Sequence, residues 1–84
     1  MMTSAPIMEA RVVDKDWQER TKGILKAELK RKGLSYRDLA ERLTAMGVPE
    51  SETNIKNKIS RGGFTAVFFI QCLQAIGVRE LRLD

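Results

Sequence analysis

The sequence predicts an all-α domain, and three observations support this fold class. Apolar residues recur at spacings of three and four along most of the chain, which is the period of an amphipathic helix. Four such segments each begin near a polar side chain that can cap a helix, and each ends at glycine. The sequence contains no two-residue hairpin signal and no long β-branched run. We therefore expect a small bundle of four to five helices.

Length and composition limit what the chain can do. Its 84 residues suffice for one domain and are too few for two independent cores. The formal net charge of +4 suits a polyanionic partner without requiring one. With no histidine and one cysteine, Cys72, we expect no internal disulfide, no metal site, no cofactor and no histidine-based catalysis. No catalytic residues are predicted, and the protein is not expected to be an enzyme.

Three features indicate a cytoplasmic protein. Cys72 lies in the most apolar stretch of the chain, and a buried free thiol fits a reducing compartment. No apolar run approaches the roughly 20 residues needed to cross a bilayer. The N-terminus lacks the basic region and the long apolar core of a signal peptide.

Residues 1–13 have no clear period and contain Pro6, so we interpret them as a flexible N-terminal arm. Residues 14–84 then form a single helical domain. Asp16 is a suitable N-cap for its first helix, because Glu19 completes a capping-box pattern.

The first helix is expected to end at Gly33, after a basic last turn that favours the helix dipole. Its predicted inward stripe consists of Trp17, Thr21, Ile24, Leu25 and Leu29. A second stripe, made of Lys22, Lys26 and Lys30, is either a row of phosphate contacts or an ordinary exposed surface. Gly23 lies in mid-helix, where it costs about 1 kcal/mol relative to alanine, and close approach of a neighbouring element is one explanation.

Ser35 is predicted to cap the second helix, with Asp38 at the third helical position and a stop at Gly47. Its expected inward residues are Leu39, Ala40, Leu43 and Met46. Ala40 is small enough for a second helix to cross closely.

The third helix is predicted to begin after Ser51 and to end at Gly62. Ile55 and Ile59, one turn apart, are its inward residues. The outward residues are then mostly polar, namely Thr53, Asn54, Lys56, Asn57, Lys58, Ser60 and Arg61.

Thr65 is predicted to cap a fourth helix that ends at Gly77, with Phe64 packing back as a hydrophobic staple. This helix is apolar nearly all round, which is typical of a helix that is half core and half interface. A homodimer through the fourth helix or the C-terminal tail is therefore plausible. Residues 78–84 fit either a short fifth helix or a strand.

The second and third helices, with the glycine turn between them, carry a family resemblance. The run GLSYRDLAERL, then MGV, a polar cap and NIKNKISRG, resembles the Cro/C1-type (lambda-repressor-like) helix-turn-helix family over roughly residues 25–78. The chain looks like one of the small uncharacterised bacterial domains of that group. The resemblance implies a helix-turn-helix in which residues 51–61 form the recognition helix.

Four departures from the family pattern leave the angle of the third helix and the register of its base contacts open. Three residues, 44–46, separate Leu43 from the turn glycine, and the connection over residues 49–52 is long. Tyr36 stands where the family commonly has glutamine. The inward isoleucines of the third helix are spaced by four rather than three.

The resemblance implies sequence-specific binding of double-stranded DNA and transcription regulation. Side-chain chemistry then suggests that the base contacts are Thr53, Asn54, Lys56, Asn57 and Arg61. The corresponding phosphate contacts are Ser35, Tyr36, Arg37 and Lys58. Tyr36 is also explained as a side chain that covers the corner between the first and second helices. Glu50 and Glu52 at the start of the third helix would oppose phosphate, or else accept hydrogen bonds from cytosine amino groups.

Two alternatives stay open. The second and third helices are also explained as core helices of a bundle whose Lys and Asn residues are merely solvated. The chain is also explained as a protein-interaction module that uses the apolar surface of the fourth helix, since fold alone does not decide function.

Overall fold

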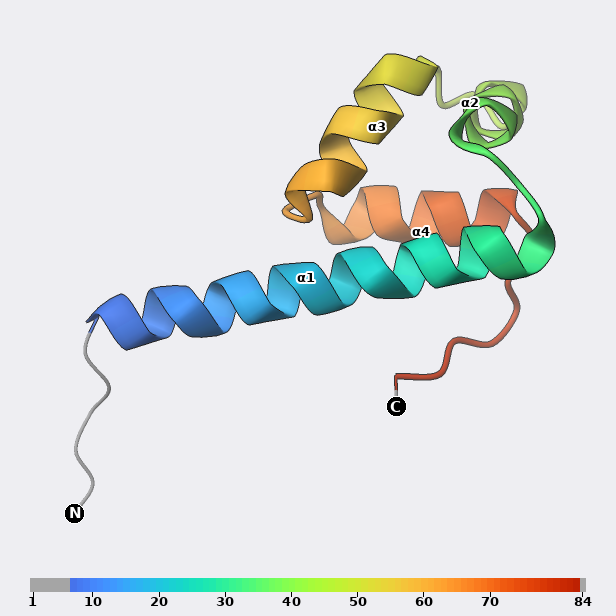
Figure 1. The fold of residues 1–84 in the computed structure, drawn as a ribbon. Coiled ribbons are helices and arrows are strands. Elements are labelled where there is room, and N and C mark those ends of the chain that lie inside the picture. Colours follow the sequence, from blue (N-terminus) through green and yellow to red (C-terminus); the bar gives the residue numbers. More distant parts are fainter. Residues whose placement is uncertain (1–6, 84) are drawn as a thin grey trace.

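A computed structural model describes residues 7–83, with side chains described from Lys15 onward. This part of the chain forms four helices and no strand (Figure 1). The helices are α1 (Ile7–Lys32), α2 (Tyr36–Ala45), α3 (Glu52–Arg61) and α4 (Ala66–Ala75). The predicted all-α class is confirmed.

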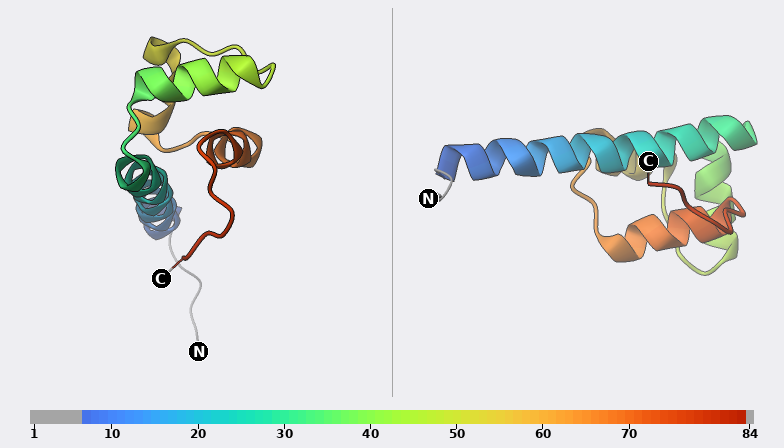
Figure 2. Two further views of the ribbon diagram at one scale, coloured as in Figure 1. Left: turned by 90° about the vertical axis from the view of Figure 1, so that its right-hand side faces the viewer. Right: turned by 90° about the horizontal axis from the view of Figure 1, so that it is seen from below.

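The helices pack as a compact four-helix globule. The helix α4 lies alongside the C-terminal part of α1, and α2 and α3 lie together on one side of this pair (Figures 1 and 2). Both α1 and α2 contact α3, and both also contact α4. One core therefore lies between the four helices. Among the described residues, no helix has the length and apolar character needed to cross a membrane.

Every helix contributes apolar side chains to this core. Its buried members are Leu25, Leu29, Leu39, Leu43, Ile55, Ile59, Phe68, Cys72, Leu73 and Ile76. Each large aliphatic side chain that is fully buried contributes about 1.5–3 kcal/mol relative to an exposed position. A small core of this kind fixes how α2 and α3 lie on the α1–α4 pair.

The N-caps predicted for α2, α3 and α4 are confirmed. The Ser35 hydroxyl accepts a hydrogen bond from the Asp38 N–H, and the Asp38 carboxylate accepts one from the Ser35 N–H, which completes a capping box. Ser51 and Thr65 cap α3 and α4 in the same manner, through the N–H groups of the third helical residues.

The predicted packing of Phe64 onto α4 is also confirmed. Its ring centroid lies 5.9 Å from that of Phe69 and 5.6 Å from that of Phe68. The glycine stops are confirmed as well, since each has a positive φ. They are Gly33, Gly47, Gly62 and Gly77.

The start of the first helix differs from the sequence prediction. The helix α1 begins at Ile7, so Asp16 lies inside the helix and does not cap it. Residues 7–13 of the predicted flexible arm are helical, and residues 1–6 lie outside the described residues. The capping prediction was wrong because a good cap residue permits a helix start without requiring one.

Two side chains predicted to face inward are exposed. Trp17 is 57% exposed, whereas Leu25 and Leu29 of the same predicted stripe are buried. The reason is that the core ends before it reaches this part of α1. Met46, the C-cap of α2, is 44% exposed because the helix has already ended there.

The close approach predicted at Gly23 occurs instead at Gly62. A Cβ atom on Gly23 would meet nothing within 4 Å. A Cβ atom on Gly62 would lie 2.8 Å from the carbonyl oxygen of Gln18 in α1. The end of α3 thus rests on the backbone of α1.

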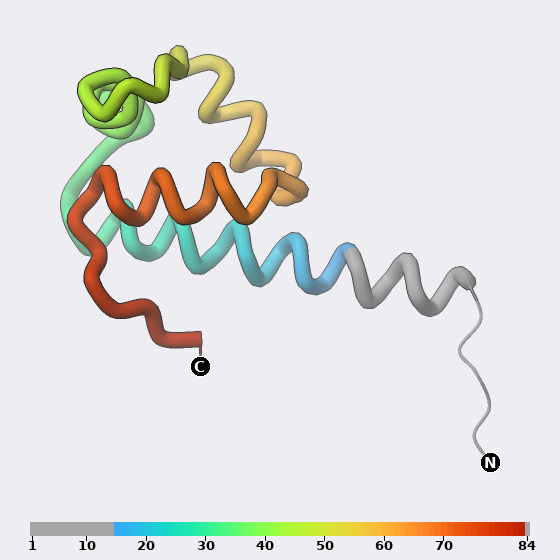
Figure 3. Tube along the Cα trace, turned by 180° about the vertical axis from the view of Figure 1, so that it is seen from behind, coloured from blue at the N-terminus to red at the C-terminus, as the bar shows by residue number. Residues whose placement is uncertain are grey.

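The C-terminal segment forms neither the helix nor the strand considered for it. Residues 78–83 have no regular secondary structure and turn back from the end of α4 (Figure 3). Leu81 packs against the core, and the carbonyl oxygen of Leu83 accepts a hydrogen bond from Arg20 at 2.6 Å. The segment therefore covers part of α1.

Basic side chains link distant elements by donating to backbone carbonyl groups. Lys22 of α1 donates to the Ser60 carbonyl near the end of α3 at 3.2 Å. Arg42 of α2 donates to the carbonyl of Ala75, the last residue of α4, at 3.3 Å. Such bonds satisfy carbonyl groups that a helix end leaves without an intrahelical partner.

Candidate nucleic-acid interface

The outer face of α3 carries the side chains predicted to contact bases. Ile55 and Ile59 are fully buried and fix the opposite side of the helix against the core. Thr53, Asn57 and Arg61 follow one another at a spacing of four, so they lie in one row on the exposed side. The two flanking positions, Asn54 and Lys56, are exposed as well.

These exposed side chains are available to a ligand. Within the described chain, none of the five predicted base-contacting side chains forms a hydrogen bond or an ion pair with another residue. The α3 backbone is meanwhile fixed at both ends, by the Ser51 cap and by Gly62 against α1. The row is therefore carried on a rigid support.

Lys58 differs from its neighbours on α3. Its ammonium lies 2.6 Å from a carboxylate oxygen of Glu50 and 4.8 Å from the centroid of the Phe68 ring. The contact with Glu50 spans the start of α3, and the contact with Phe68 reaches α4. Lys58 thus serves packing within the domain, a role that its helical position alone did not reveal.

The same pair changes the charge at the start of α3. The Glu50 side chain is only 13% exposed and is neutralised by Lys58. Of the two acids expected to oppose phosphate at this end, Glu52 is exposed and has no such partner among the described residues.

The start of α2 holds the remaining predicted phosphate contacts. The Ser35 hydroxyl is used in the capping box with Asp38. Hydrogen bonds from the Ser35 backbone N–H and hydroxyl hold the pKa of the Asp38 carboxyl below its usual value. Arg37 is exposed and makes only a loose 3.8 Å pair with Glu41. Arg37 is therefore an exposed cation at this helix start, held only by this loose pair.

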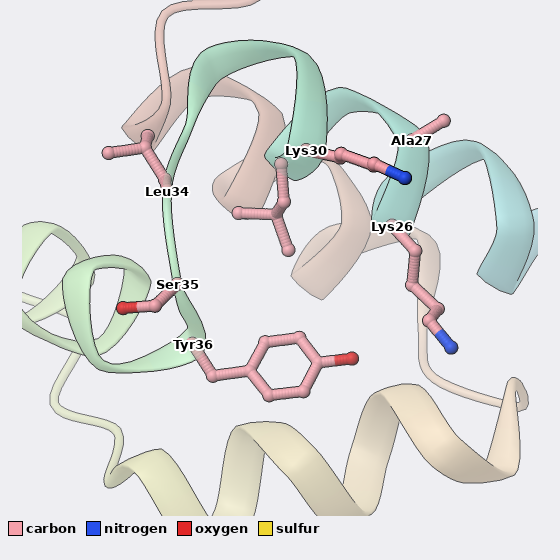
Figure 4. Close-up of a pocket in the computed structure, with 7 residues that line it drawn as sticks. Lys26, Ala27, Lys30, Leu34, Ser35 and Tyr36 are labelled. Atoms are coloured by element: carbon pink, nitrogen blue, oxygen red, sulfur yellow. The ribbon is translucent and has the colours of Figure 1, made fainter.

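Tyr36 lies in a groove between α1 and α2 that the sequence did not reveal. The groove has a volume of about 500 Å³ and is lined by Lys26, Ala27, Leu29, Lys30, Leu34, Ser35 and Tyr36. Figure 4 shows the Tyr36 ring extending from the start of α2 toward Lys26 of α1, while the Ser35 hydroxyl points away. The ring therefore forms a wall of the groove.

The lysine stripe of α1 divides into two parts. Lys22 is engaged by Glu19 at 3.2 Å and by the Ser60 carbonyl at 3.2 Å. Lys26 and Lys30 are exposed and border the groove. The spacing of Lys26 and Lys30 could be read from the sequence. Their position beside Tyr36 depends instead on how α2 folds back from Gly33.

The described residues include no group of three or more carboxylate or thiol side chains that could hold a metal ion. The groups that the fold brings together are instead cations, amides and hydroxyls from α1, α2 and α3. Such groups recognise anions and the polar edges of bases.

Comparisons with known proteins place the chain in a domain family. A search of curated proteins and a search of solved structures each gave no match. A family model described as "Domain of unknown function (DUF6471)" matches residues 17–81. The matched region contains α2, α3, α4, the larger part of α1 and the C-terminal segment to Leu81. This chain is therefore a member of the DUF6471 domain family.

Proposed function

We propose that this domain binds double-stranded DNA as a transcription regulator, with α2 and α3 acting as a helix-turn-helix and α3 as the recognition helix. The observation that carries the proposal is the unpartnered row of Thr53, Asn57 and Arg61 among the described residues, on a helix whose opposite side is buried. A helix that presents long polar side chains from a fixed backbone suits the major groove.

The side chains of this row match the hydrogen-bonding groups of base edges. An Asn57 or Asn54 amide can pair with the N6 and N7 groups of adenine, and Arg61 or Lys56 with the acceptors of guanine. The internal pairing of Glu50 with Lys58 supports the proposal, because it lowers the repulsion of phosphate at the start of α3.

Phosphate contacts are assigned to a second set of groups beside this row. Arg37 and the Tyr36 hydroxyl lie at the start of α2, where exposed backbone N–H groups also favour an anion. Lys26 and Lys30 of α1 extend this set across the groove. Lys58 is not assigned to this set of phosphate contacts, because its ammonium pairs with Glu50 and lies over the Phe68 ring.

The direct test is a titration of the full chain with duplex DNA at two salt concentrations, followed by backbone amide shifts. The logarithm of the affinity should fall with the logarithm of salt concentration, with a slope near −0.9 per phosphate contacted. The shifts should concentrate in residues 35–37 and 53–61. Shifts confined to α4, or none at millimolar DNA, would contradict the proposal.

Variants sharpen this test. Asn57→Ala should weaken binding to a preferred sequence by about 1–3 kcal/mol. Arg37→Gln should weaken binding to all sequences alike and lower the salt slope by about 1. Gln74→Ala, at an exposed position of α4, is the matched control and should change neither quantity.

A second function has one observation in its favour, the apolar outer surface of α4. Val67 is 66% exposed and Ile70 is 59% exposed, and the spacing of three places them together on the helix surface. This pair suits a protein partner or a second copy of the chain. A regulator that is dimeric through this surface would read half-sites about 34 Å apart.

Sedimentation measures whether this surface joins two copies. Ile70→Glu should produce a monomer if α4 forms a homodimer, whereas Thr44→Glu, at an exposed position of α2, should leave the assembly unchanged. Phe69 of the same helix is unsuitable for this test, because it is half-buried against the core and against Phe64. A charge at Phe69 would therefore disturb folding rather than assembly.

A further inference from the structure

The groove between α1 and α2 combines an apolar lining with two positive charges. Its apolar lining residues are Ala27, Leu29 and Leu34. The Tyr36 ring supplies an aromatic wall (Figure 4). Lys26 and Lys30, one helical turn apart, lie at its border. Its volume of about 500 Å³ falls within the range of small-molecule sites.

Three polar groups of the groove have no partner within the described chain, whereas the Ser35 hydroxyl is bound to Asp38. The ammonium groups of Lys26 and Lys30 and the hydroxyl of Tyr36 form no hydrogen bond or ion pair with another described residue. Lys22, the third lysine of the same stripe, is by contrast bound to Glu19 and Ser60. The two cations at the groove thus lack a counter-charge.

We infer that this groove binds a small aromatic carboxylate, whose ring lies against Tyr36 and Leu29 and whose carboxylate is held by Lys26 and Lys30. An aromatic ring packs well against the face or edge of another ring, and its contact with the aliphatic lining removes apolar surface from water. A carboxylate at the border gains two charge-assisted hydrogen bonds. An uncharged ring of the same shape lacks that gain, and a bare anion lacks the apolar contacts.

The carboxylate site does not depend on the proposed DNA binding. The effect of a bound carboxylate on DNA affinity does rest on that proposed function. Lys26 and Lys30 belong to the proposed phosphate contacts, so a carboxylate held by these two lysines occupies charges that the DNA would use. The bound ligand should then lower the affinity for DNA. This would give the domain an effector that acts by direct competition, without a separate sensing domain.

The test uses 2-naphthoate as the probe, added to the full chain and followed by backbone amide shifts without DNA. Saturable shifts should appear in residues 26–30 and 34–36. The neutral analogue 2-naphthalenemethanol should bind at least fivefold more weakly, and inorganic phosphate should cause no saturable shift there. Shifts scattered over the surface, or centred on another part of the chain, would overturn the site.

Charge variants provide the matched comparison. The double variant Lys26→Gln/Lys30→Gln should lose at least fivefold in naphthoate affinity. The control Lys15→Gln/Arg79→Gln removes the same charge from exposed positions outside the groove lining and should bind like the parent. Equal affinity of the parent and the groove variant would refute the assigned role of the two lysines.

A final arm separates this inference from the proposed function. Duplex DNA is titrated with and without saturating naphthoate, and its apparent affinity should fall when the probe is bound. Binding of naphthoate by a chain that ignores DNA would uphold the site and reject DNA binding. Binding of DNA without any binding of naphthoate would reject the site alone, and simultaneous binding without competition would reject the effector role.

Discussion

Gly62 lies directly against the backbone of Gln18. A Cβ atom at Gly62 would lie 2.8 Å from the Gln18 carbonyl oxygen and 3.2 Å from its carbonyl carbon. The φ angle of Gly62 is +72°, which most side chains disfavour. One position thus meets two requirements, since it ends α3 and lets that end touch α1.

The first prediction is that Gly62→Ala destabilises the domain more than Gly77→Ala. Both glycines have positive φ, so alanine costs roughly 1–2 kcal/mol at each from backbone strain. A Cβ at Gly77 meets nothing within 4 Å, whereas at Gly62 it collides with the backbone. We expect a further cost of about 1–3 kcal/mol at Gly62. Urea denaturation measures both, and equal losses would show that the contact with Gln18 does not matter.

The second prediction concerns Asp38 and acid stability. Hydrogen bonds from Ser35 favour the charged carboxylate, so the folded-state pKa lies below the unfolded value. The resulting stabilisation is complete above the unfolded pKa, near 4, and is lost as pH falls through the folded pKa. The stability difference between the parent and Asp38→Asn should therefore shrink on acidification. A difference that stays constant from pH 6 to the acid limit would contradict this account.

The third prediction compares the contribution to stability of the Glu50–Lys58 pair with that of the Glu41–Arg37 pair. Glu50 is mostly buried, and its carboxylate lies 2.6 Å from Lys58. Glu41 is 70% exposed, and its 3.8 Å pair with Arg37 is open to water. Glu50→Gln should lower the free energy of unfolding by about 1 kcal/mol, and Glu41→Gln by less than about 0.5 kcal/mol. Chemical denaturation at neutral pH decides between this order and its reverse.

The fourth prediction is that the Cys72 thiol is inert in the folded protein. Burial, together with a smaller effect of the Glu50 charge, raises the pKa of Cys72 to about 12 from 9.0. This lowers the thiolate fraction near pH 8 by about 1,000-fold, before any restriction of access is counted. Labelling with a thiol-reactive dye should therefore be very slow in buffer and fast in denaturant. Rapid labelling of the folded chain would show that Cys72 is accessible.

Features fixed by local chemistry could be predicted from the sequence. Ser35, Ser51 and Thr65 act through N–H groups three residues away, so their roles depend on neighbours in the chain. The glycine stops depend only on φ at one position. The inward positions Ile55 and Ile59 followed from helical spacing alone. These elements define the exposed row on α3.

Features that depend on distant elements could not be predicted in the same way. Nothing in the local sequence shows that Gly62 meets Gln18, because the contact depends on the path of α3 relative to α1. The spacing that suggested an inward Trp17 says nothing about where the core ends. Tyr36 joins Lys26 and Lys30 only because α2 folds back over α1. The groove is therefore a product of tertiary structure.

The bonds from basic side chains to distant carbonyl groups have a consequence for sequence variation. Lys22 and Arg42 must keep a long cationic side chain, whereas their acceptors, at Ser60 and Ala75, belong to the backbone and are present in any residue. Each contact therefore constrains the residue type at the donor position and leaves the residue type at the acceptor position unconstrained. Such contacts leave no trace of paired substitution between relatives, so residue covariation would miss these links between helices.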